Sequence, residues 1–366
     1  MATKIRLGLI GASVEGTWSA RSHLPALKVS TDIELKAVCT TKADSAEATR
    51  KAFGAQLAFD DYRKMLASDE IDAVSVVVRV PKHYAPTIAA IEAGKHVYCE
   101  WPLGRTTLEA IEMSALAEEK GILTAVGLQA RVSPALMYMK EMVESGFVGE
   151  VLSVHVSLLT EGLLSRPSNR LWQGDADLGA NTLTIAGGHT IDAMRFVVGD
   201  LARFSSTVET QAAHWINHDT GQLIDVTSPD NILLSGHLDN GAVASIHVAS
   251  IPHCGSGYRM EIYGREGTLV ATANNSPQMS DVILNGAKGD DTIKLIPVPD
   301  RLKVTAQGTP SGTAMNVGQM YTYFARSIRG KTQKQPNFKN AVHLHHLIDS
   351  IKRSSKESRV IKPSLN

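Results

Sequence analysis

The chain has 366 residues, with 37 lysines and arginines against 37 aspartates and glutamates, so its formal net charge is zero. A chain of this length is expected to form two domains, since one domain typically takes roughly 100–200 residues. Hydrophobic residues make up 43% and charged residues 20%, a balance that is typical of globular proteins and excludes a disordered chain. Zero net charge also argues against a nucleic-acid partner, because such binding depends on a basic face.

The sequence indicates neither a membrane partner nor an oxidising compartment. Its longest apolar run, near residues 73–80, is interrupted by Arg79 and is far shorter than the ~20 residues of a spanning helix. The first residues lack the apolar core and cleavage site of a secretory signal. Cys39, Cys99 and Cys254 are far apart and odd in number, which favours neither disulfides nor a Cys-x-x-Cys metal site. We therefore expect a cytoplasmic protein.

The first 129 residues alternate short β-branched runs with helical patterns, which is typical of βαβ units around a parallel sheet. Strands are expected at 5–10, 33–39, 73–78, 96–99 and 123–126, and helices at 42–53, 84–93 and 106–120. Thr106 with Glu109 three residues later has the pattern of a capping box, and Gly121 ends the last of these helices.

After residue 149 the segments become longer and are joined by turns such as Asp239-Asn240-Gly241, which predicts hairpins and a mostly antiparallel sheet. Strands are expected at 151–158, 232–238, 242–249, 259–263 and 281–284. Helices at 134–144, 189–197, 316–329 and 337–350 are expected to cover one face of this sheet. The prediction is an α/β chain with a first domain at 1–129 and a second at 130–366.

The first expected strand ends in a turn that matches part of a dinucleotide-binding fingerprint. Gly11 and Gly16 have the spacing of its outer glycines, whereas Ser13 stands at the middle position. A strand that leads through such a turn into a helix offers backbone N–H groups to a pyrophosphate. Thr17 after Gly16 excludes a Walker-type site. The motif predicts a Rossmann NAD(P) site; the alternative is a tight strand–helix turn without a ligand.

The end of the second expected strand bears on the choice of cofactor. NAD-preferring folds usually place a carboxylate there to bind the ribose, but this chain has Thr40, Thr41 and Lys42. Hydroxyls and a lysine accept a 2′-phosphate more readily than they replace a carboxylate. The segment therefore favours NADP slightly over NAD, unless Lys42 only points into water at a solvated helix start.

The strand at 96–99 leads into the turn Glu100-Trp101-Pro102. A carboxylate at the carboxyl end of a parallel strand lies at the crevice where open α/β sheets bind ligands. Pro102 disfavours helix at Trp101 and is compatible with a cis peptide bond.

Several blocks of the sequence, in order, resemble the glucose-fructose oxidoreductase / inositol dehydrogenase / MocA family over essentially the whole chain. Within the family the likeness is closest to the fungal galactose/lactose metabolism regulatory subgroup. The blocks are Gly11-Ala12-Ser13 with Trp18, Ser22-His23-Leu24-Pro25-Ala26, His83-Tyr84, Ile91-Glu92-Ala93-Gly94-Lys95-His96-Val97, Glu100-Trp101-Pro102, Gln129-Ala130-Arg131 with Ser133-Pro134, and Gly188-His189-Thr190-Ile191-Asp192.

The resemblance implies an N-terminal Rossmann domain, a C-terminal domain with an open sheet that mediates a homodimer or homotetramer, and NAD or NADP as cofactor. The residues implied at the cofactor are Gly11, Ala12, Ser13, Gly16, Trp18, Thr40, Thr41, Lys42, Val78, Arg79, His83, Glu100, Trp101, Pro102 and Gln129.

The chain departs twice from the pattern that the family's dehydrogenases share. Trp101 stands where they have a lysine, and Ile185 stands where they have an aspartate four residues before the histidine. An indole cannot titrate near neutrality. His189 is the matching residue that can exchange a proton, and Asp192 three residues on is placed to orient it. The alternative is that His189 packs a helix start and Asp192 pairs with Arg195.

Two further side chains are candidates for binding a substrate. Trp172 lies in a polar loop, where it would stack on a sugar ring or plug the base of the second domain. Arg131 would bind a substrate hydroxyl or carboxylate, or tie the two domains together. His343, His345, His346 and Asp349 do not share one helical face, so an amphipathic helix accounts for them better than a metal site.

Two functions from different classes are consistent with these residues. The first is an NAD(P)-dependent oxidoreductase acting on a sugar, polyol or related hydroxylated small molecule, with His189 moving the proton and with Trp101 and Glu100 at the nicotinamide end. The second is a non-catalytic NAD(P)-binding regulator. The missing lysine and aspartate favour the regulator, and the intact histidine favours the enzyme.

Overall fold

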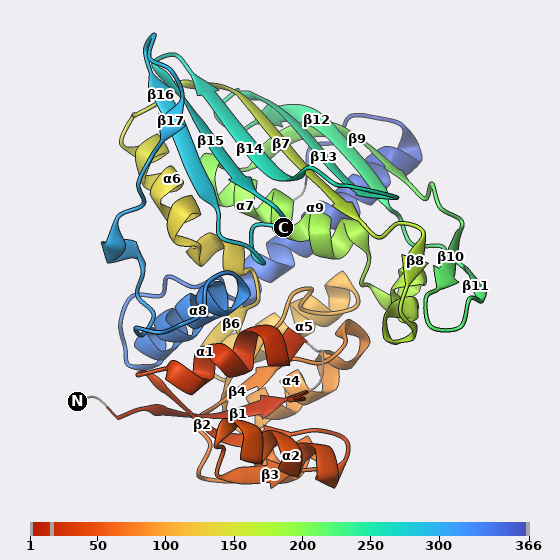
Figure 1. Cartoon of the computed structure of the whole chain (residues 1–366), viewed down its shortest axis with the longest axis vertical. Helices are drawn as coiled ribbons and strands as arrows, with labels where there is room; N and C mark the ends of the chain where they lie inside the picture. The colour runs from red at the N-terminus through yellow and green to blue at the C-terminus, as the bar shows by residue number, and fades with distance from the viewer. Residues whose placement is uncertain (1–2, 15–17, 364–366) are drawn as a thin grey trace. The chain divides into compact units, whose positions relative to one another are not determined.

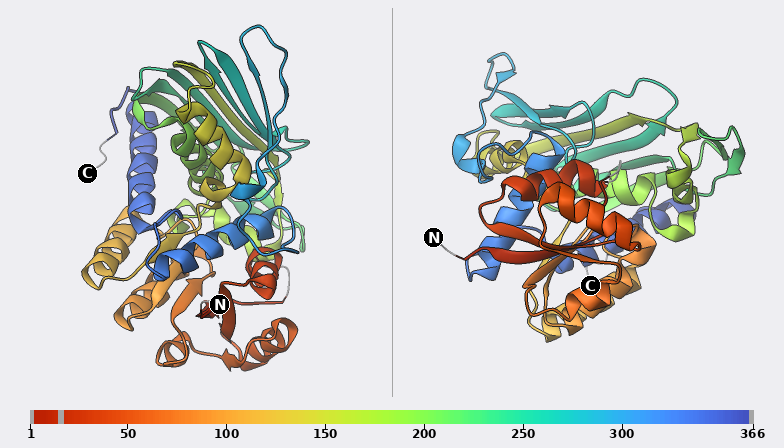
Figure 2. Two further views of the ribbon diagram at one scale, coloured as in Figure 1. Left: turned by 90° about the vertical axis from the view of Figure 1, so that its left-hand side faces the viewer. Right: turned by 60° about the horizontal axis from the view of Figure 1, so that its bottom comes forward.

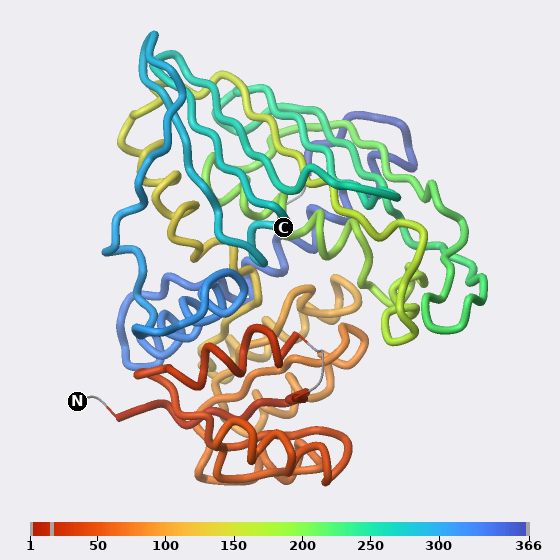
Figure 3. Tube along the Cα trace, in the orientation of Figure 1, coloured from red at the N-terminus to blue at the C-terminus, as the bar shows by residue number. Residues whose placement is uncertain are grey.

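The computed structural model describes residues 3–14 and 18–363. The chain forms two compact units: unit 1 comprises Met1–Val132 and Lys303–Val342, and unit 2 comprises Ser133–Leu302 and His343–Asn366. Figure 3 allows the chain to be followed as it leaves unit 1, builds most of unit 2, returns once to unit 1 and then re-enters unit 2. This differs from the expected division at residue 129, because residues 303–342 pack with the N-terminal segment.

Unit 1 contains a six-stranded, wholly parallel sheet in the order β3-β2-β1-β4-β5-β6 (Figure 1). The strands are mostly buried along their length, as expected where helices cover both faces of a parallel sheet. Five of them were expected; β3 was missed because its three half-buried residues carry no pattern that distinguishes a strand. The strands are β1 (Ile5–Ile10), β2 (Ile33–Cys39), β3 (Leu57–Phe59), β4 (Ala73–Val76), β5 (His96–Cys99) and β6 (Thr124–Val126).

Helices surround this sheet and confirm the expected βαβ alternation. Thr106 caps α5, its Oγ1 accepting from the N–H of Glu109 at 3.2 Å, but the Glu109 carboxylate accepts from the N–H of Arg105 and not from that of Thr106. The second hydrogen bond of the expected capping box is therefore made with the N–H of Arg105, the residue before the N-cap. The helical segments of unit 1 are η1 (Ser19–His23), α1 (Leu24–Val29), α2 (Ala43–Phe53), α3 (Tyr62–Leu66), η2 (Val80–Lys82), α4 (Tyr84–Glu92), α5 (Thr107–Glu119), η3 (Gln129–Val132) and α8 (Thr313–Ile328). The short η7 (Asp300–Leu302) belongs to unit 2 and contacts α6.

The position of α8 corrects one expectation. Residues 316–329 were expected on the antiparallel sheet of the second domain, but α8 packs against η1, α1, β2 and β6 within unit 1. Its amphipathic pattern predicts that one face is buried but does not say against which sheet. α9 (Phe338–Glu357) begins in unit 1 and ends in unit 2.

Unit 2 is built on an eight-stranded sheet in the order β17-β16-β15-β14-β7-β13-β12-β9 (Figure 1). All neighbours are antiparallel except β7 and β13, so the expected mostly antiparallel sheet is confirmed. The turn at Asn240 and Gly241 joins β12 to β13, with Gly241 at φ +90° as such hairpins require. The strands are β7 (Val151–Glu161), β9 (Leu201–Glu209), β12 (Asn231–Leu238), β13 (Val243–Ile251), β14 (Gly257–Gly264), β15 (Gly267–Ala273), β16 (Ile283–Lys288) and β17 (Lys294–Leu295).

One face of this sheet carries α6 (Pro134–Glu144), α7 (Gly188–Val198) and the end of α9, as Figures 1 and 2 show. Ser206 of β9 is tied to α9, its hydroxyl donating to the carbonyl of Ile351 at 2.7 Å. The other face is open to solvent within unit 2. Its exposed apolar side chains include Leu233, Val243, Tyr263 and Ile283.

A small second sheet, in the order β11-β10-β8, completes unit 2 and was not expected. It consists of β8 (Ser165–Arg166), β10 (His214–Asn217) and β11 (Leu223–Asp225), with η4 (Ser168–Gly174) and η5 (Ala176–Leu178) beside them and η6 (Thr182–Gly187) before α7. Of the helices within the described residues, none is both long and apolar enough to cross a bilayer.

His345 on α9 makes the stability of the fold dependent on pH. Burial, with lesser effects of Lys352 and His346, lowers the pKa of His345 to about 3. The unfolded chain takes up this proton near its ordinary pKa of about 6.5. The free energy of unfolding should therefore be unaffected by His345 above about pH 7, and should fall by about 2 kcal/mol between pH 7 and pH 5 on its account.

We expect H345Q to lose this component, so that its free energy of unfolding depends less steeply on pH than that of the wild type. Urea unfolding at several pH values between 7.5 and 5 would measure the difference. The matched control is H343Q on the exposed face of the same helix, which should keep the wild-type slope. Equal slopes in wild type and H345Q would contradict the prediction.

Candidate functional site

The carboxyl ends of four strands of unit 1 lie at one edge of its sheet. Ile10 of β1 pairs with Val76 of β4, Val76 with Cys99 of β5, and Cys99 with Val126 of β6. The chain reverses its strand order between β1 and β4, and in such sheets ligands bind beyond the carboxyl ends at this point. The residues that follow these strands are therefore the candidate site.

The turn after β1 requires glycine at its first position. Gly11 has φ +89°, and a Cβ there would lie 2.3 Å from the carbonyl oxygen of Val77, which follows β4. The N–H groups of Gly11 and Ala12 both donate to the carbonyl of Cys39. The backbone at Gly11 therefore passes too close to its neighbours for a side chain at this position.

The serine at the middle fingerprint position is accommodated by a local hydrogen-bonded turn. The N–H of Ser13 donates to Ser19 Oγ at 3.3 Å, and the Ser19 hydroxyl donates to the carbonyl of Gly11 at 3.1 Å. Trp18 lies edge-on to His23, with ring centres 6.4 Å apart. Gly16 lies outside the described residues. This turn lies where Rossmann folds bind a pyrophosphate, and the N–H groups of residues 11–13 are hydrogen-bonded within the protein in this structure.

Thr40 and Lys42 form a compact turn at the end of β2. The Thr40 hydroxyl donates to the carbonyl of Lys42 at 2.7 Å, and the side chains of Thr41 and Lys42 are exposed. Asp61 caps α3 through the N–H of Arg63, and Asp60 pairs with Lys64. The nearby carboxylates are therefore engaged, whereas the hydroxyl of Thr41 and the amine of Lys42 face solvent.

Glu100, after β5, is the centre of a buried polar network. Gln129 Nε2 donates to this carboxylate from 3.0 Å of both oxygens, and His23 Nε2 lies 3.0 Å from Oε1. Burial alone would raise the pKa of Glu100, but the hydrogen bonds from His23, Gln129 and Tyr98 outweigh it and lower that pKa. Glu100 is therefore an ion held in place by protein donors.

The network continues from His23 into the second part of unit 1. His23 Nδ1 lies 2.7 Å from the hydroxyl of Tyr321 on α8, and that hydroxyl lies 2.9 Å from Ser75 Oγ on β4. One consistent assignment has Ser75 donating to Tyr321, Tyr321 to Nδ1, and Nε2–H to Glu100. In this assignment the hydroxyl hydrogens of Ser75 and Tyr321 and the ring hydrogen of His23 all point along the row of hydrogen bonds toward Glu100.

A glycine makes room for this carboxylate. A Cβ at Gly127, after β6, would lie 2.6 Å from Glu100 Oε2. Any other residue would therefore push Glu100 out of its network. The contact between Glu100 and Gln129 therefore depends on Gly127, a residue that sequence reasoning did not single out.

His83 holds two loops of the edge together, one of which contains the cis Trp101–Pro102 peptide bond. His83 Nδ1 lies 2.8 Å from the carbonyl oxygen of Pro102, and Nε2 lies 3.0 Å from that of Val78. Burial lowers the pKa of His83, although both carbonyls favour its protonated form. Because both ring nitrogens face backbone carbonyls, His83 is not available for the direct cofactor contact that was expected, and positions the loops instead.

In unit 2, His189 and Asp192 lie three residues apart on α7 and are both buried. Before them, η6 is capped by Asn181, whose Oδ1 accepts from the N–H of Thr184 while Thr184 Oγ1 accepts from the N–H of Asn181. η6 is a π-helical segment, a form found frequently at functional sites. Ile185, at the family's aspartate position, lies within it.

The alternative that Asp192 pairs with Arg195 is wrong. Arg195 forms its ion pair with Asp200, which lies just after the helix. Trp172 lies in η4 of unit 2 and is half-buried, whereas Arg131 lies in η3 of unit 1 and Trp101 is buried in unit 1. His189, Asp192 and Trp172 thus share one unit, and Trp101, Glu100 and Arg131 share the other.

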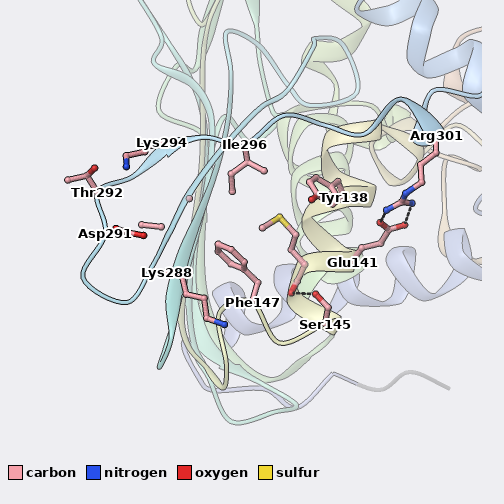
Figure 4. A pocket seen from close by; sticks show the side chains of 13 residues that line it. Tyr138, Glu141, Ser145, Phe147, Lys288, Asp291, Thr292, Lys294, Ile296 and Arg301 are labelled. Carbon is pink, nitrogen blue, oxygen red and sulfur yellow. Dashed lines mark hydrogen bonds and ion pairs between the residues drawn. The ribbon is translucent and has the colours of Figure 1, made fainter.

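Two cavities lie away from these residues. One, of about 600 Å³, opens beside α6 in unit 2, and Figure 4 shows Tyr138, Phe147 and Ile296 around it, with the Arg301–Glu141 ion pair at one side. The other, of about 590 Å³, lies in unit 1 at the amino-terminal ends of β1 and β5. Neither is lined by a candidate residue, and the second is at the edge of the sheet opposite to the ligand-binding one.

Across residues 3–14 and 18–363, no three His, Cys, Asp or Glu side chains lie together as metal ligands would. Sequence reasoning missed the roles of Ser75, Tyr98 and Tyr321, and gave none to His23 although it quoted the residue. Nothing in the local sequence connects them. A buried polar side chain at the end of a strand was the available signal, but its partners lie far away along the chain.

A doubly wound parallel sheet with a glycine turn after its first strand defines the class of Rossmann dinucleotide-binding proteins. The model of an oxidoreductase family with an NAD-binding Rossmann fold matches residues 5–128, and that of the same family's C-terminal alpha/beta domain matches residues 140–362. The chain belongs to this Gfo/Idh/MocA family.

Its relatives include both dehydrogenases and a regulator. The dehydrogenase aclE of Aspergillus oryzae is 25% identical, with 98% of each chain covered. The galactose/lactose metabolism regulatory protein GAL80 of Saccharomyces cerevisiae is 25% identical over 66% of this chain and 60% of its own.

Two solved structures have the same fold. A super-repressor mutant of Gal80p from Saccharomyces cerevisiae has a TM-score of 0.87 at 21% identity, with 98% of each chain covered. A levoglucosan dehydrogenase in complex with NADH and levoglucosan has a TM-score of 0.86 at 21% identity, with both chains fully covered.

We expect E100Q to lower the free energy of unfolding by about 2 kcal/mol at neutral pH, because it replaces the charged acceptor of His23 and Gln129. The charged form of Glu100 stabilises the fold above its ordinary pKa, so the difference should shrink as the pH falls below about 4.3. Urea unfolding measures both. The control E47Q, at an exposed helical ion pair, should change little; an equal loss in both variants would contradict the role of the network.

Proposed function

We propose that the protein is an NAD(P)-dependent oxidoreductase that transfers a hydride to or from a sugar, polyol or related hydroxylated small molecule. The observation that carries the proposal is His189, a buried histidine in the first turn of α7, in a chain whose other unit is an NAD-binding Rossmann domain. The levoglucosan dehydrogenase of the same fold is described with NADH and a sugar derivative, which supports this substrate class.

The proposed chemistry assigns one task to each side chain. The nicotinamide, when bound, exchanges a hydride with the substrate carbon. His189 takes or returns the hydroxyl proton, and Asp192 on the same helix orients the imidazole. Trp172 stacks on the substrate ring and Arg131 binds a substrate oxygen. Trp101 donates a hydrogen bond at most, since an indole does not titrate.

The proposed cofactor site follows the carboxyl ends of β1, β2, β4, β5 and β6. The turn of Gly11, Ala12 and Ser13, with Gly16 and Trp18 beyond, binds the pyrophosphate. Thr41 and Lys42 bind the adenosine ribose, with a slight preference for NADP because both face solvent and neither is a carboxylate. Val78, Arg79, Trp101 and Pro102 complete the site, which Glu100, His83 and Gln129 hold in shape.

A non-catalytic NAD(P)-binding regulator is the second candidate. Two positions favour it: Trp101 replaces the lysine of the family's dehydrogenases, and Ile185 replaces their aspartate. In a regulator, cofactor occupancy would change an interaction with a protein partner and no proton would need to move. The likeness to GAL80 is consistent with this reading.

We expect H189A to lose turnover by a factor of about 10²–10⁴, the usual contribution of a positioned acid–base group, while its affinity for either reduced cofactor changes by less than about twofold. Cofactor fluorescence titrations with NADH and NADPH, followed by turnover of a sugar and polyol panel, measure both quantities. The control H253A removes an exposed histidine and should match the wild type.

Undiminished turnover in H189A would contradict the role of His189. Tight cofactor binding by the wild type without turnover of any panel member would instead favour the regulator. The same titrations decide between NAD and NADP.

We further propose that the open face of the eight-stranded sheet joins copies of the chain into a homodimer or homotetramer. Leu233, Val243, Tyr263 and Ile283 are exposed on it, and their burial would stabilise such an assembly. L233K should reduce the mass measured by sedimentation, because it places a charge in the interface. L108K, at an exposed leucine of α5 in unit 1, should not; an unchanged mass in L233K would contradict the proposal.

A further inference from the structure

The small sheet of unit 2 holds an arginine in an unusual environment. Arg166 of β8 pairs in parallel with Asn217 of β10, and Trp215 lies two residues earlier on that strand. Since side chains two residues apart share a face of a strand, Arg166, Trp215 and Asn217 lie on the same side. The guanidinium carbon of Arg166 lies 5.1 Å from the centre of the Trp215 ring, and that tryptophan is buried.

The guanidinium of Arg166 has no counter-ion among the described residues. Its Nε is shut off from solvent and has no hydrogen-bond acceptor, and no carboxylate of residues 3–14 or 18–363 forms an ion pair with it. Its two terminal nitrogens make no hydrogen bond either, but they are not shut off from solvent. Burial, with a lesser effect of Arg170, lowers the pKa of Arg166.

The carboxylates of the same small sheet are engaged elsewhere. Asp219 accepts from the N–H of Ser168 at 2.8 Å, and Asp225 lies 2.9 Å from His214 Nδ1. Asn217 Oδ1 accepts from the hydroxyl of Ser168. The local acceptors are thus satisfied by other donors, and the positive charge of Arg166 is left without compensation.

The stacking on Trp215 does not account for the burial of this charge. A cation–π contact contributes about 0.5–2 kcal/mol. Burying the Nε edge of a cation still costs free energy unless an acceptor or an anion replaces the lost water. A partly buried cation with two free terminal nitrogens is therefore expected where a ligand supplies the negative charge.

Two glycines clear the space that this arrangement needs. Gly162 has φ +102°, and a Cβ there would lie 2.6 Å from Arg166 Nη1. A Cβ at Gly174 would lie 3.3 Å from the Trp215 ring. Any side chain at Gly162 would push the guanidinium aside, so the backbone is shaped around Arg166 and its supporting indole.

The segment that carries Arg166 starts from the same strand end as the segment that leads to His189. The N–H of Leu163 donates to the carbonyl of Ile251 at the end of β13, and Thr182 at the start of η6 is hydrogen-bonded to the neighbouring Ser250. Both segments belong to unit 2 and leave its sheet at adjacent residues. Arg166 and the candidate proton-transfer group therefore lie on segments that leave the sheet of unit 2 at adjacent residues.

We propose that Arg166 binds the carboxylate of the substrate through its two terminal nitrogens, and that the substrate is a hydroxylated carboxylic acid such as a sugar acid. The planar fork of arginine matches a carboxylate with two parallel hydrogen bonds. The hydroxylated part of this assignment rests on the proposed function, whereas the carboxylate rests on Arg166 alone.

Isothermal titration calorimetry without cofactor tests the proposal. The probes are D-glucuronate, D-gluconate and L-lactate, with D-glucose as the neutral match and D-glucose 6-phosphate as the phosphate match. We expect at least one carboxylate to bind the wild type at least tenfold more tightly than glucose. R166Q should weaken that binding at least tenfold, and R166K should weaken it less because it keeps the charge but loses the fork.

The control is R259Q on the open face of unit 2, where Arg259 is paired with Glu261 at 2.7 Å, and it should bind like the wild type. Circular dichroism checks that each variant is folded; if R166Q is not, R166K carries the comparison. Wild-type binding of all three carboxylates no tighter than that of glucose would overturn the proposal. So would carboxylate binding that survives in R166Q, or tight binding of the phosphate ester alone.

These outcomes are separable from those of the proposed function. Turnover of neutral polyols without Arg166-dependent binding of acids would leave the oxidoreductase standing and remove the carboxylate site. Arg166-dependent binding of acids without turnover would support the carboxylate site and contradict the oxidoreductase.

Discussion

The buried carboxylate of Glu100 constrains several elements of unit 1 at once. Glu100 is 8% exposed at the carboxyl end of β5, and a charge in that position must be hydrogen-bonded or cost several kcal/mol. His23, Gln129 and Tyr98 meet this requirement, and Gly127 leaves the space. Through Tyr321 the same requirement connects α8 to the Rossmann sheet.

This network explains how the candidate cofactor site is kept in shape. Glu100 joins the loops after β5 and β6, and His83 joins the loop after β4 to the turn at Pro102. The loops are thus held by groups that face one another and not a ligand. Glycines allow close approaches at two points of this edge, Gly11 after β1 and Gly127 after β6. His83, Glu100 and Gln129 thus shape these loops from within the protein.

The rule that a buried charge needs a partner also applies to the arginines of unit 2. Arg195 is buried at the end of α7 and is paired with Asp200, so its charge is accounted for within the fold. Arg166 is held against an indole with no carboxylate beside it among the described residues. Arg195 is thus paired with a carboxylate within the fold, whereas Arg166 is the arginine for which we propose a ligand. The family relationship supports the proposed reaction class, and the uncompensated charge of Arg166 is the basis of the proposed carboxylate site.

The sequence alone determined the elements that have strong local patterns. The apolar runs of β1, β2 and β5, the amphipathic α6 and the hairpin at Asn240-Gly241 could be predicted because their signals lie within a few residues. The glycine turn at Gly11 and the position of His189 in a helix start were also predictable. Short elements such as β3 and β8 were not, since a few residues carry no period.

Only the tertiary structure decided which of these elements meet. The amphipathic pattern of α8 requires a buried face but does not name its partner, and the chain places it on the parallel sheet. His23 and Tyr321 are hydrogen-bonded although 298 residues separate them, and Arg195 pairs with Asp200 and not with Asp192. Local sequence encodes periodicity and turn geometry, whereas the pairing of buried charges depends on which distant segments exclude water together.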